Sequence, residues 1–288
     1  MKALVIGGSG FLGSHISDQL TLNGHEVTIF DKHESNWIND KQKFIQGDVS
    51  DYNSLEKAYK DIDVVFHLAG ISDLDEAYES GISTAVVNIL GTVNSLELSC
   101  KNNISRFVYA SSVYVNSNSG GLYKVSKRAA EDYILEYNKL FKLDFTIIRY
   151  GSIYGPRSDE SNGLYRIIKK AVNDNKLEYE GSLESIREYV HVEDVAIASA
   201  KILEKEFNNK VINLTGQERL KIEDLLKMIA EILDLDESVK KTTNDRKGHY
   251  ITTPYNYNKL IARKYVMPFY IDFGQGILQM IEEINLEK

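Results

Sequence analysis

The segment Tyr123–Lys127 holds a phenol and an ammonium at a spacing that suits acid–base chemistry. On a helix, side chains four positions apart lie on one face, about one turn from each other. A nearby cation lowers the pKa of a phenol, and a phenol tuned in this way can exchange a proton with a substrate near neutral pH. The same spacing recurs at Tyr165–Lys169 and at Tyr255–Lys259, so the surrounding elements must distinguish the three candidates.

Short apolar runs alternate with helical patterns through the first half of the chain. The predicted strands are Ala3–Ile6, Val27–Phe30, Phe44–Gln46, Val64–Leu68, Phe107–Ala110 and Thr146–Arg149. The intervening helices are expected to begin near Gly10, Ser54, Ser83 and Leu122. Apolar strands separated by helices are typical of a parallel sheet buried on both faces. Right-handed crossovers then predict an α/β fold with a doubly wound parallel sheet of the Rossmann type.

A glycine-rich loop, Gly7–Gly13, joins the first predicted strand to the first predicted helix. Its first glycine permits a tight turn, its middle one lets the backbone approach a pyrophosphate, and its last one lets the helix pack on the strand. The helix N-terminus offers N–H groups and a positive dipole end to phosphates. The predicted dinucleotide contacts are Gly7, Gly10, Phe11, Leu12 and Gly13, with a purely structural turn as the alternative.

Asp31 weighs against the purely structural turn. It ends the second predicted strand, about 20 residues beyond the loop, where an acid meets the adenosine ribose hydroxyls. A carboxylate there accepts from the 2′-OH and repels a 2′-phosphate, which favours NAD over NADP, while the adjacent Lys32 leaves NADP open. Further cofactor contacts are predicted at strand ends, where ligands bind in such sheets, at Asp48, Val49, Leu68, Ala69 and Gly70.

After Pro156 the alternating pattern loosens. Further elements are predicted as helices over Gly163–Asn173, Glu193–Glu206 and Ile222–Leu233, a strand over Val211–Leu214 and a last helix from about Gln275. We expect residues 1–157 and about 190–216 to form an NAD-binding Rossmann domain. Residues of about 158–189 together with 217–288 are expected to form a smaller C-terminal, substrate-binding lobe.

The position of Tyr123 in the predicted sheet separates it from the other two candidates. The fifth strand runs into Ser111 and Ser112, the helix with Tyr123 and Lys127 follows, and the sixth strand comes next. Hydroxyl, phenol and ammonium therefore converge at the sheet edge where the nicotinamide end of a cofactor would lie. The pairs at Tyr165 and Tyr255 lie outside this arrangement, so we interpret their spacing as accidental.

Taken in order, these motifs resemble the extended short-chain dehydrogenase/reductase family, specifically its NAD-dependent nucleotide-sugar epimerase/dehydratase group. The resembling segments are GGSGFLG, the strand end at Asp31, GDVSD, HLAG, VNILGT, YASSVY, YKVSK, RYGSIYGPR and REYVHVEDVA. They span roughly residues 2 to 216, and the chain after Gln217 matches only loosely.

The resemblance implies a catalytic role for three residues. Tyr123 would remove a hydroxyl proton while hydride leaves the sugar carbon for NAD. Lys127 would lower the pKa of that tyrosine and bind the nicotinamide ribose, and Ser112 would orient the hydroxyl or relay the proton.

The resemblance also implies binding residues. The implied cofactor contacts are Asn88, Ser111 and Tyr150, and the implied substrate contacts are Ser152, Arg187 and Arg246. For Asn88 a structural role is an equal alternative. An arginine fork suits the oxygens of a nucleotide diphosphate, and a plain salt bridge is the alternative for both arginines.

Departures from the family pattern narrow the expected reaction. Only ten residues separate Ser112 from Tyr123, and the Ser-Ser-Val-Tyr run lacks two residues usually found before Val-Tyr. Sugar 4,6-dehydratases of this group carry an Asp-Glu pair there to expel water, so we predict no such dehydration. The 3,5-epimerases use a cysteine near this loop, whereas Cys100 lies in a helical pattern and is expected in the core.

Redox chemistry at a sugar alcohol carbon, most often C4, is what the resemblance then implies. In a 4-epimerase, the 4-keto sugar turns in the site and takes hydride back on its other face. In the alternative, a C4 dehydrogenase or ketoreductase, the keto sugar leaves or arrives. The shortened loop resembles a subgroup of bacterial surface-polysaccharide pathways, with GDP-heptose as a candidate substrate. A non-catalytic NAD-sensing protein is the least favoured alternative, because Tyr123, Lys127 and Ser112 are intact.

Composition excludes several other classes of protein. The 288 residues carry 42 acids against 34 bases, a formal net charge of −8, which disfavours nucleic-acid binding. A single cysteine cannot form an intramolecular disulfide or a cysteine metal cage. The histidines form no metal set and no apolar run reaches membrane-spanning length. We expect a cytoplasmic enzyme with NAD as cofactor and a nucleotide-diphosphate sugar as partner. The family pattern implies a homodimer formed through the helices around Asn94 and Tyr133.

Overall fold

The computed structural model describes residues 1–235, 240–242, 249, 251 and 263–286. Two features predicted from the sequence, Arg246 and the pair Tyr255–Lys259, lie outside the described residues. Within the described part of the chain, no helix combines the length and apolarity needed to cross a bilayer.

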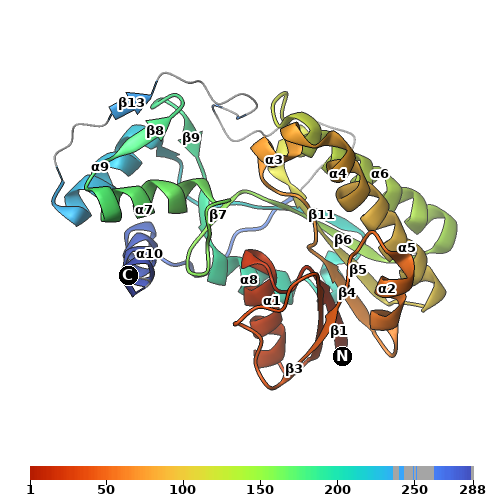
Figure 1. The fold of residues 1–288 in the computed structure, drawn as a ribbon. Coiled ribbons are helices and arrows are strands. Elements are labelled where there is room, and N and C mark those ends of the chain that lie inside the picture. Colours follow the sequence, from red (N-terminus) through yellow and green to blue (C-terminus); the bar gives the residue numbers. More distant parts are fainter. Residues whose placement is uncertain (236–239, 243–248, 250, 252–262, 287–288) are drawn as a thin grey trace.

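An eight-stranded parallel sheet forms the centre of the molecule (Figure 1), in the order β14-β11-β6-β5-β4-β1-β2-β3. Its strands are β1 (Lys2–Ile6), β2 (Glu26–Asp31), β3 (Gln42–Gln46), β4 (Val64–His67), β5 (Arg106–Ser112), β6 (Phe145–Tyr150), β11 (Lys210–Leu214) and β14 (Arg263–Lys264). The chain winds outward from β1 to β3 in one direction and from β4 onward in the other. The crevice at this reversal, at the carboxyl ends of the strands, is where ligands bind in such sheets.

Helices cover both faces of the sheet (Figure 1). The helical elements of the main domain are α1 (Phe11–Leu22), α2 (Tyr52–Glu56), the 3₁₀ turn η1 (Lys57–Tyr59), α3 (Leu74–Glu79), α4 (Gly81–Ala85), the π-helical turn η2 (Val86–Leu90), α5 (Gly91–Lys101), the 3₁₀ turn η3 (Val113–Asn116), α6 (Gly121–Phe141), α8 (Val192–Lys201) and the 3₁₀ turn η4 (Lys205–Phe207). Helices α1 and α8 pack together on one face, and α5 and α6 contribute to the core on the other.

The alternation of side chains along each strand builds a separate core on each face. In β1, Ala3 and Val5 join the core under α1 and α8, whereas Leu4 and Ile6 join the core under α5 and α6. All four side chains are fully buried. Burying a side chain of the size of valine, leucine or isoleucine stabilises a fold by about 1.5–3 kcal/mol. The continuous apolar runs in the sequence therefore reflect a sheet covered on both sides.

A smaller lobe lies beyond the carboxyl edge of the sheet (Figure 1). Its elements, with the strand pair that leads to it, are β7 (Ser152–Tyr154), α7 (Gly163–Asp174), β8 (Glu178–Glu180), β9 (Ile186–Arg187), β10 (Tyr189–His191), β12 (Leu220–Lys221), α9 (Ile222–Leu233), β13 (Lys240–Thr242) and α10 (Phe273–Leu286). A third core joins α7, α9 and α10 through side chains such as Ile168, Leu226 and Ile281.

The predicted α/β fold class is confirmed, and each predicted strand is present with bounds that differ by a few residues at most. The predicted helix Glu193–Glu206 extends too far, because Leu203 and Glu204 form tight turns onto Ala200 and Lys201. The predicted division also differs in one place. Strand β14 falls within residues 217–288 of the expected lobe, yet it pairs with β11 and extends the main sheet.

Candidate active site

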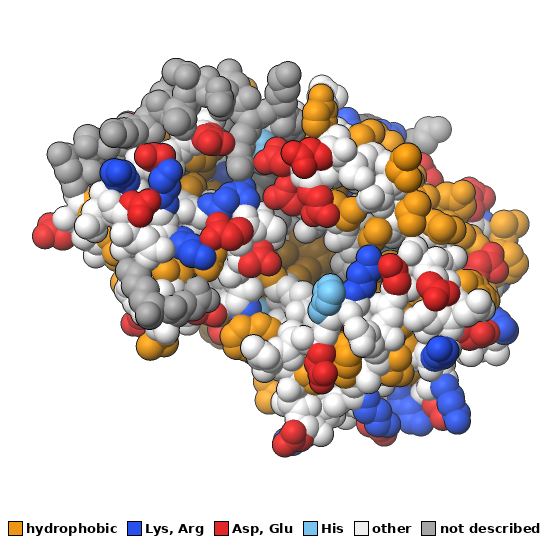
Figure 2. All heavy atoms as spheres, viewed as in Figure 1, with side chains coloured by type: hydrophobic (Ala, Val, Ile, Leu, Met, Phe, Trp, Pro, Cys, Tyr) orange, Lys and Arg blue, Asp and Glu red, His pale blue; other side chains and the backbone are white. Residues whose placement is uncertain are grey.

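A cavity of about 1680 Å³ lies between the carboxyl edge of the main sheet and the lobe. Figure 2 shows the molecule hollowed between its two parts, with acidic side chains gathered on the rim over α3. Every predicted site residue among the described residues lines this cavity except Asn88. The fold thus brings the predicted cofactor, catalytic and substrate residues into one place.

The glycine-rich loop has the geometry that a dinucleotide cradle needs. Gly7 has a φ of +84°, and a Cβ there would lie 2.5 Å from the backbone N of Ala69. A Cβ at Gly13 would lie 2.0 Å from the carbonyl oxygen of Gly7. Gly10, which precedes α1, would meet nothing closer than 3.5 Å. Packing therefore requires glycine at 7 and 13, whereas Gly10 leaves space at the helix N-terminus for the diphosphate of NAD.

Asp31 ends β2 beside this loop and accepts a hydrogen bond from the backbone N of Ser9 at 3.0 Å. The adjacent Lys32 forms a 3.0 Å ion pair with Asp48 at the end of β3. Both side chains of this pair are partly exposed. The residues present fit NAD at this end of the cavity.

Replacing Asp31 by alanine should weaken the preference for NAD over NADP, because the carboxylate that accepts from the 2′-OH and repels the 2′-phosphate is lost. Calorimetry measures both dissociation constants, and that of NADP divided by that of NAD should fall about tenfold or more. The exposed Glu26 at the start of β2 provides the control variant Glu26→Ala, which should keep the wild-type ratio. An unchanged ratio in Asp31→Ala would remove Asp31 from the ribose site.

The catalytic candidates converge from two elements. Ser112 is the last residue of β5, and Tyr123 lies in the first turn of α6 with Lys127 one turn later. Two glycines in the left-handed region, Gly120 at φ +98° and Gly121 at φ +47°, turn the chain into that helix. All three side chains are more than nine-tenths buried and line the cavity.

The electrostatics of this group differ in part from the prediction. Burial raises the pKa of Tyr123, and a side-chain hydrogen bond with Ser112 opposes this rise. Lys127 donates to the carbonyl oxygen of Ala110 at 2.9 Å, and its Nζ lies 5.9 Å from the ring centroid of Tyr123. Burial lowers the pKa of Lys127 to about 8. In the protein alone the pKa of Tyr123 is therefore raised by burial, opposite to the lowering by Lys127 that the sequence predicted.

Polar groups of three predicted cofactor residues bond to the protein itself. The amide of Asn88 bonds both the backbone N and O of Ile71, at 2.7 and 3.0 Å, and reaches Ser126 at 2.9 Å. These bonds are consistent with a structural role for Asn88, which the sequence left as an equal alternative to cofactor binding. The hydroxyl of Ser111 donates to Glu131 at 2.5 Å, and the hydroxyls of Tyr150 and Ser199 lie 2.8 Å apart. Ser111 and Tyr150 still line the cavity.

Arg187 and Ser152 reach the cavity from the lobe side. Arg187 lies in β9 and is largely buried, and its Nη1 donates to the carbonyl oxygens of Ile186 and Ile251 at 3.1 and 3.4 Å. Ser152 begins β7, directly after the cavity-lining Tyr150 and Gly151. Arg187 thus lines the cavity with a largely buried guanidinium that also bonds the backbone of the lobe.

Comparison with known proteins identifies the family. The model of the NAD dependent epimerase/dehydratase family matches residues 3–215. The chain belongs to this family. Its sequence is 33% identical to a putative UDP-glucose 4-epimerase of Methanocaldococcus jannaschii over 75% of this chain and 77% of the relative. It is 24% identical to a dTDP-glucose 4,6-dehydratase of an Actinoplanes species over 98% of this chain and 97% of the relative.

Solved structures agree on the fold of this epimerase/dehydratase chain. A UDP-glucose 4-epimerase from Thermotoga maritima, solved with UDP-glucose, superposes with a TM-score of 0.88 at 24% identity and covers 100% of this chain and 99% of its own. A UDP-glucuronic acid 4-epimerase from Bacillus cereus, solved with UDP-glucuronic acid and NAD, has a TM-score of 0.86 at 24% identity with both chains fully covered. The cofactor of the family is NAD.

Tyr114 is a cavity residue of this family member that sequence reasoning missed. Its ring meets that of Tyr123 edge-on with centroids 6.1 Å apart, and its backbone N donates to Ser112 at 3.3 Å. Its hydroxyl lies 3.3 Å from Nδ1 of His249. The available signal was the position of Tyr114 two residues after Ser112, where η3 begins at the cavity edge.

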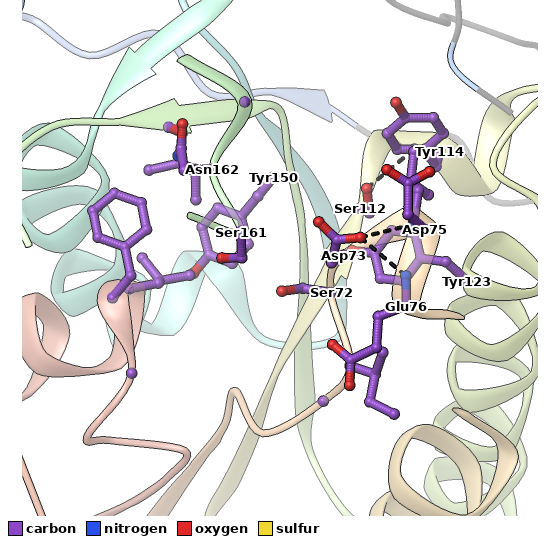
Figure 3. Close-up of a pocket in the computed structure, with 18 of the residues that line it drawn as sticks. Ser72, Asp73, Asp75, Glu76, Ser112, Tyr114, Tyr123, Tyr150, Ser161 and Asn162 are labelled. Atoms are coloured by element: carbon purple, nitrogen blue, oxygen red, sulfur yellow. Dashed lines mark hydrogen bonds between the residues drawn. The ribbon is translucent and has the colours of Figure 1, made fainter. Parts of the chain in front are cut away.

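Acidic residues at the start of α3 form another part of the cavity wall that the sequence reasoning missed. Asp73 caps α3 by accepting from the backbone N of Asp75 and Glu76 at 2.8 and 3.0 Å, and all three residues line the cavity. Figure 3 shows Ser112, Tyr114 and Tyr123 on one side of the cavity, and Ser161 and Asn162 at the α7 N-terminus on the other. Ser72 and Asp73, at the start of α3, lie between the two groups. An aspartate before two acids is an N-cap signature that the sequence offered.

Proposed function

We propose that this chain catalyses NAD-dependent 4-epimerisation of a nucleotide-diphosphate sugar through a transient 4-keto sugar. The observation that supports this most is the shared cavity of Tyr123, Lys127 and Ser112 with the dinucleotide cradle. A proton-transfer group beside a hydride acceptor is the minimum that alcohol oxidation requires. NAD, when bound, accepts the hydride from C4 and returns it.

The side chains of the protein handle the proton. As the tyrosinate, Tyr123 accepts the proton of the C4 hydroxyl on its Oη as the C4–H bond breaks, and the phenol gives it back when the ketone is reduced on its other face. Ser112 already bonds Tyr123 and can hold the same hydroxyl in line. The ammonium of Lys127, one turn along α6, stabilises the tyrosinate before it takes up this proton.

The substrate class is proposed from the lobe side of the cavity and from the relatives. Arg187 would bind the diphosphate of the sugar nucleotide with its guanidinium. Ser152, which begins β7, would contact the sugar. Several relatives are named for UDP-sugars or dTDP-sugars, so both nucleotides belong in the first tests.

Replacing Arg187 by alanine should raise the KM for the nucleotide sugar about tenfold or more, with a smaller change in kcat, because a charge-assisted contact with the diphosphate is lost. Steady-state kinetics with saturating NAD measures both constants. Lys221, on the neighbouring strand β12, forms an ion pair with Glu184 at 2.9 Å, and Lys221→Ala should leave KM unchanged. A wild-type KM in Arg187→Ala would favour a purely structural role for this arginine.

The second candidate is a C4 dehydrogenase or ketoreductase of a nucleotide sugar, with GDP-heptose among its substrates. The short segment after Ser112 supports it, because Tyr114, whose ring meets that of Tyr123, forms the wall near the reacting carbon. Product analysis by NMR across UDP-, GDP- and dTDP-sugars, with and without added NAD, separates the two. An epimer formed without added cofactor supports the epimerase. A ketone formed in proportion to added NAD supports the dehydrogenase, and a 6-deoxy-4-keto product would show dehydration instead.

We propose a cytoplasmic homodimer formed through the helices around Asn94 and Tyr133. Apolar side chains are exposed near both positions, at Leu90 directly before α5 and at Tyr133 on α6. Light scattering should give a mass twice that of the 32.7 kDa chain. The variant Leu90→Glu/Tyr133→Glu should shift the protein to monomer, because it places charge in an apolar interface. A wild-type mass equal to one chain would contradict the dimer.

A further inference from the structure

A buried ion pair lies directly behind the catalytic group. Nη2 of Arg149 contacts Oε2 of Glu131 at 2.6 Å, and Nε contacts Oε1 at 2.9 Å, so the guanidinium grips the carboxylate with two parallel bonds. Each residue is 1% exposed. Removing two charges from water costs about as much as their attraction returns. Stability alone is therefore a weak explanation for the pair.

The pair connects the elements that carry the active-site residues. Oε1 of Glu131 accepts from the hydroxyl of Ser111 at 2.5 Å, and Nη1 of Arg149 donates to Asn116 at 3.3 Å. Glu131 lies on α6, Arg149 on β6, Ser111 at the end of β5 and Asn116 in η3. Four segments thus meet at one carboxylate and one guanidinium.

Each of these segments holds a residue that lines the cavity close by. Lys127 precedes Glu131 by one helical turn, Ser112 follows Ser111, and Tyr150 follows Arg149. The sheet register places Ser111 opposite Arg149 and Ser112 opposite Tyr150. A shift at the ion pair must therefore move the serine and lysine that act on Tyr123.

Among the described residues, Glu131 is the one carboxylate that influences the pKa of Lys127. Glu131 opposes the lowering of the Lys127 pKa that burial causes. The ring of Tyr109 from β5 lies 5.1 Å from the ammonium, and burial raises the pKa of this phenol. His67 from β4 has a pKa lowered by burial to about 3, so it is neutral. Removing the charge of Glu131 therefore removes the carboxylate that opposes the lowering of the Lys127 pKa.

We propose that Glu131, held by Arg149, is a positioning residue that fixes Ser112 and Lys127 for proton transfer at Tyr123. This inference rests on the proposed function for its kinetic consequences. It makes a separate structural statement, that the segment Ser112–Asn116 is held in place by the ion pair.

The variant Glu131→Gln keeps the shape of the side chain and removes its charge, and Glu136→Gln is the matched control. Glu136 lies on the same helix in an exposed ion pair with Lys139. Glu131→Gln should lower kcat about tenfold or more with little change in KM. The alkaline limb of its pH profile should move to lower pH, because the charge that keeps Lys127 protonated is gone. Amide hydrogen exchange over Ser112–Asn116 should accelerate. Glu136→Gln should match the wild type throughout.

A purely structural role predicts a different pattern. Glu131→Gln would then unfold at a lower temperature but keep the wild-type kcat, pH limb and exchange over Ser112–Asn116, and this result overturns the proposal. If Glu131→Gln does not fold, Glu131→Asp retains the charge but draws it back from Ser111. It should show lower kcat with the alkaline limb of the wild type, and an undiminished kcat overturns the proposal. If the wild-type protein turns over no nucleotide sugar, the proposed function fails, and the exchange measurement alone decides this inference.

Discussion

Tyr123→Phe should reduce turnover of the nucleotide sugar by at least about a hundredfold, which is the usual contribution of an acid–base group. Binding of NAD should stay close to wild type, because the cradle of Gly7–Gly13 and Asp31 is untouched. The substitution removes only the Oη that bonds Ser112 and keeps the ring that meets Tyr114. Single-turnover kinetics and calorimetry with NAD measure the two effects separately.

The chain supplies a close control in Tyr165→Phe. Tyr165 and Lys169 repeat the spacing of Tyr123 and Lys127, and Nζ of Lys169 lies 5.1 Å from the ring centroid of Tyr165. This pair lies on α7 in the lobe, and Tyr165 is buried in the third core. Tyr165→Phe should keep turnover near wild type. Comparable losses in both variants, or a loss below a hundredfold in Tyr123→Phe, would contradict the assignment of the proton to Tyr123.

Lys127→Met should abolish turnover and yet stabilise the fold at neutral pH. Burial lowers the pKa of Lys127 from 10.5 to about 8, which corresponds to a cost of roughly 3 kcal/mol for keeping the ammonium buried. The lost hydrogen bond to Ala110 offsets about 1 kcal/mol of this. We therefore expect a gain of about 2 kcal/mol in the free energy of unfolding at pH 7.

The difference in stability between Lys127→Met and the wild type should depend on pH. Between pH 8 and 10.5 the folded protein has lost the Lys127 proton while the unfolded chain still holds it, so the wild type becomes more stable through this window as pH rises. Lys127→Met lacks that contribution, and its advantage should shrink toward pH 10. Urea unfolding at pH 7 and pH 10 tests this, with the exposed Lys139→Met as control. A variant less stable than wild type at pH 7 would contradict the account.

The sequence predicted the sheet well because a doubly covered strand leaves an unmistakable apolar run. It also predicted which residues would meet, because the carboxyl ends of parallel strands share one edge. Asp31, Ser112 and Arg187 reach the same cavity from segments far apart in the chain. Their convergence follows from topology, which strand order and crossover handedness constrain.

The sequence predicted less well the features that depend on side-chain packing. The Lys127–Glu131 spacing is visible in the sequence. The ion pair of Glu131 with Arg149 is not, because it depends on how α6 packs on the paired strands β5 and β6. The raised pKa of Tyr123 follows from its burial, which no spacing encodes. Strand β14 was assigned to the lobe because two residues, Arg263–Lys264, leave no periodic signal.

The central claim is that hydride leaves and returns at C4 of one sugar while Tyr123 carries the hydroxyl proton. The most direct measurement uses a nucleotide sugar deuterated at C4 and follows the product by NMR. The account predicts an epimer that retains deuterium at C4, with slower turnover than the unlabelled sugar and no reaction in Tyr123→Phe. An epimer that has exchanged the deuterium with solvent, or a ketone whose deuterium has passed to free NADH, would contradict it.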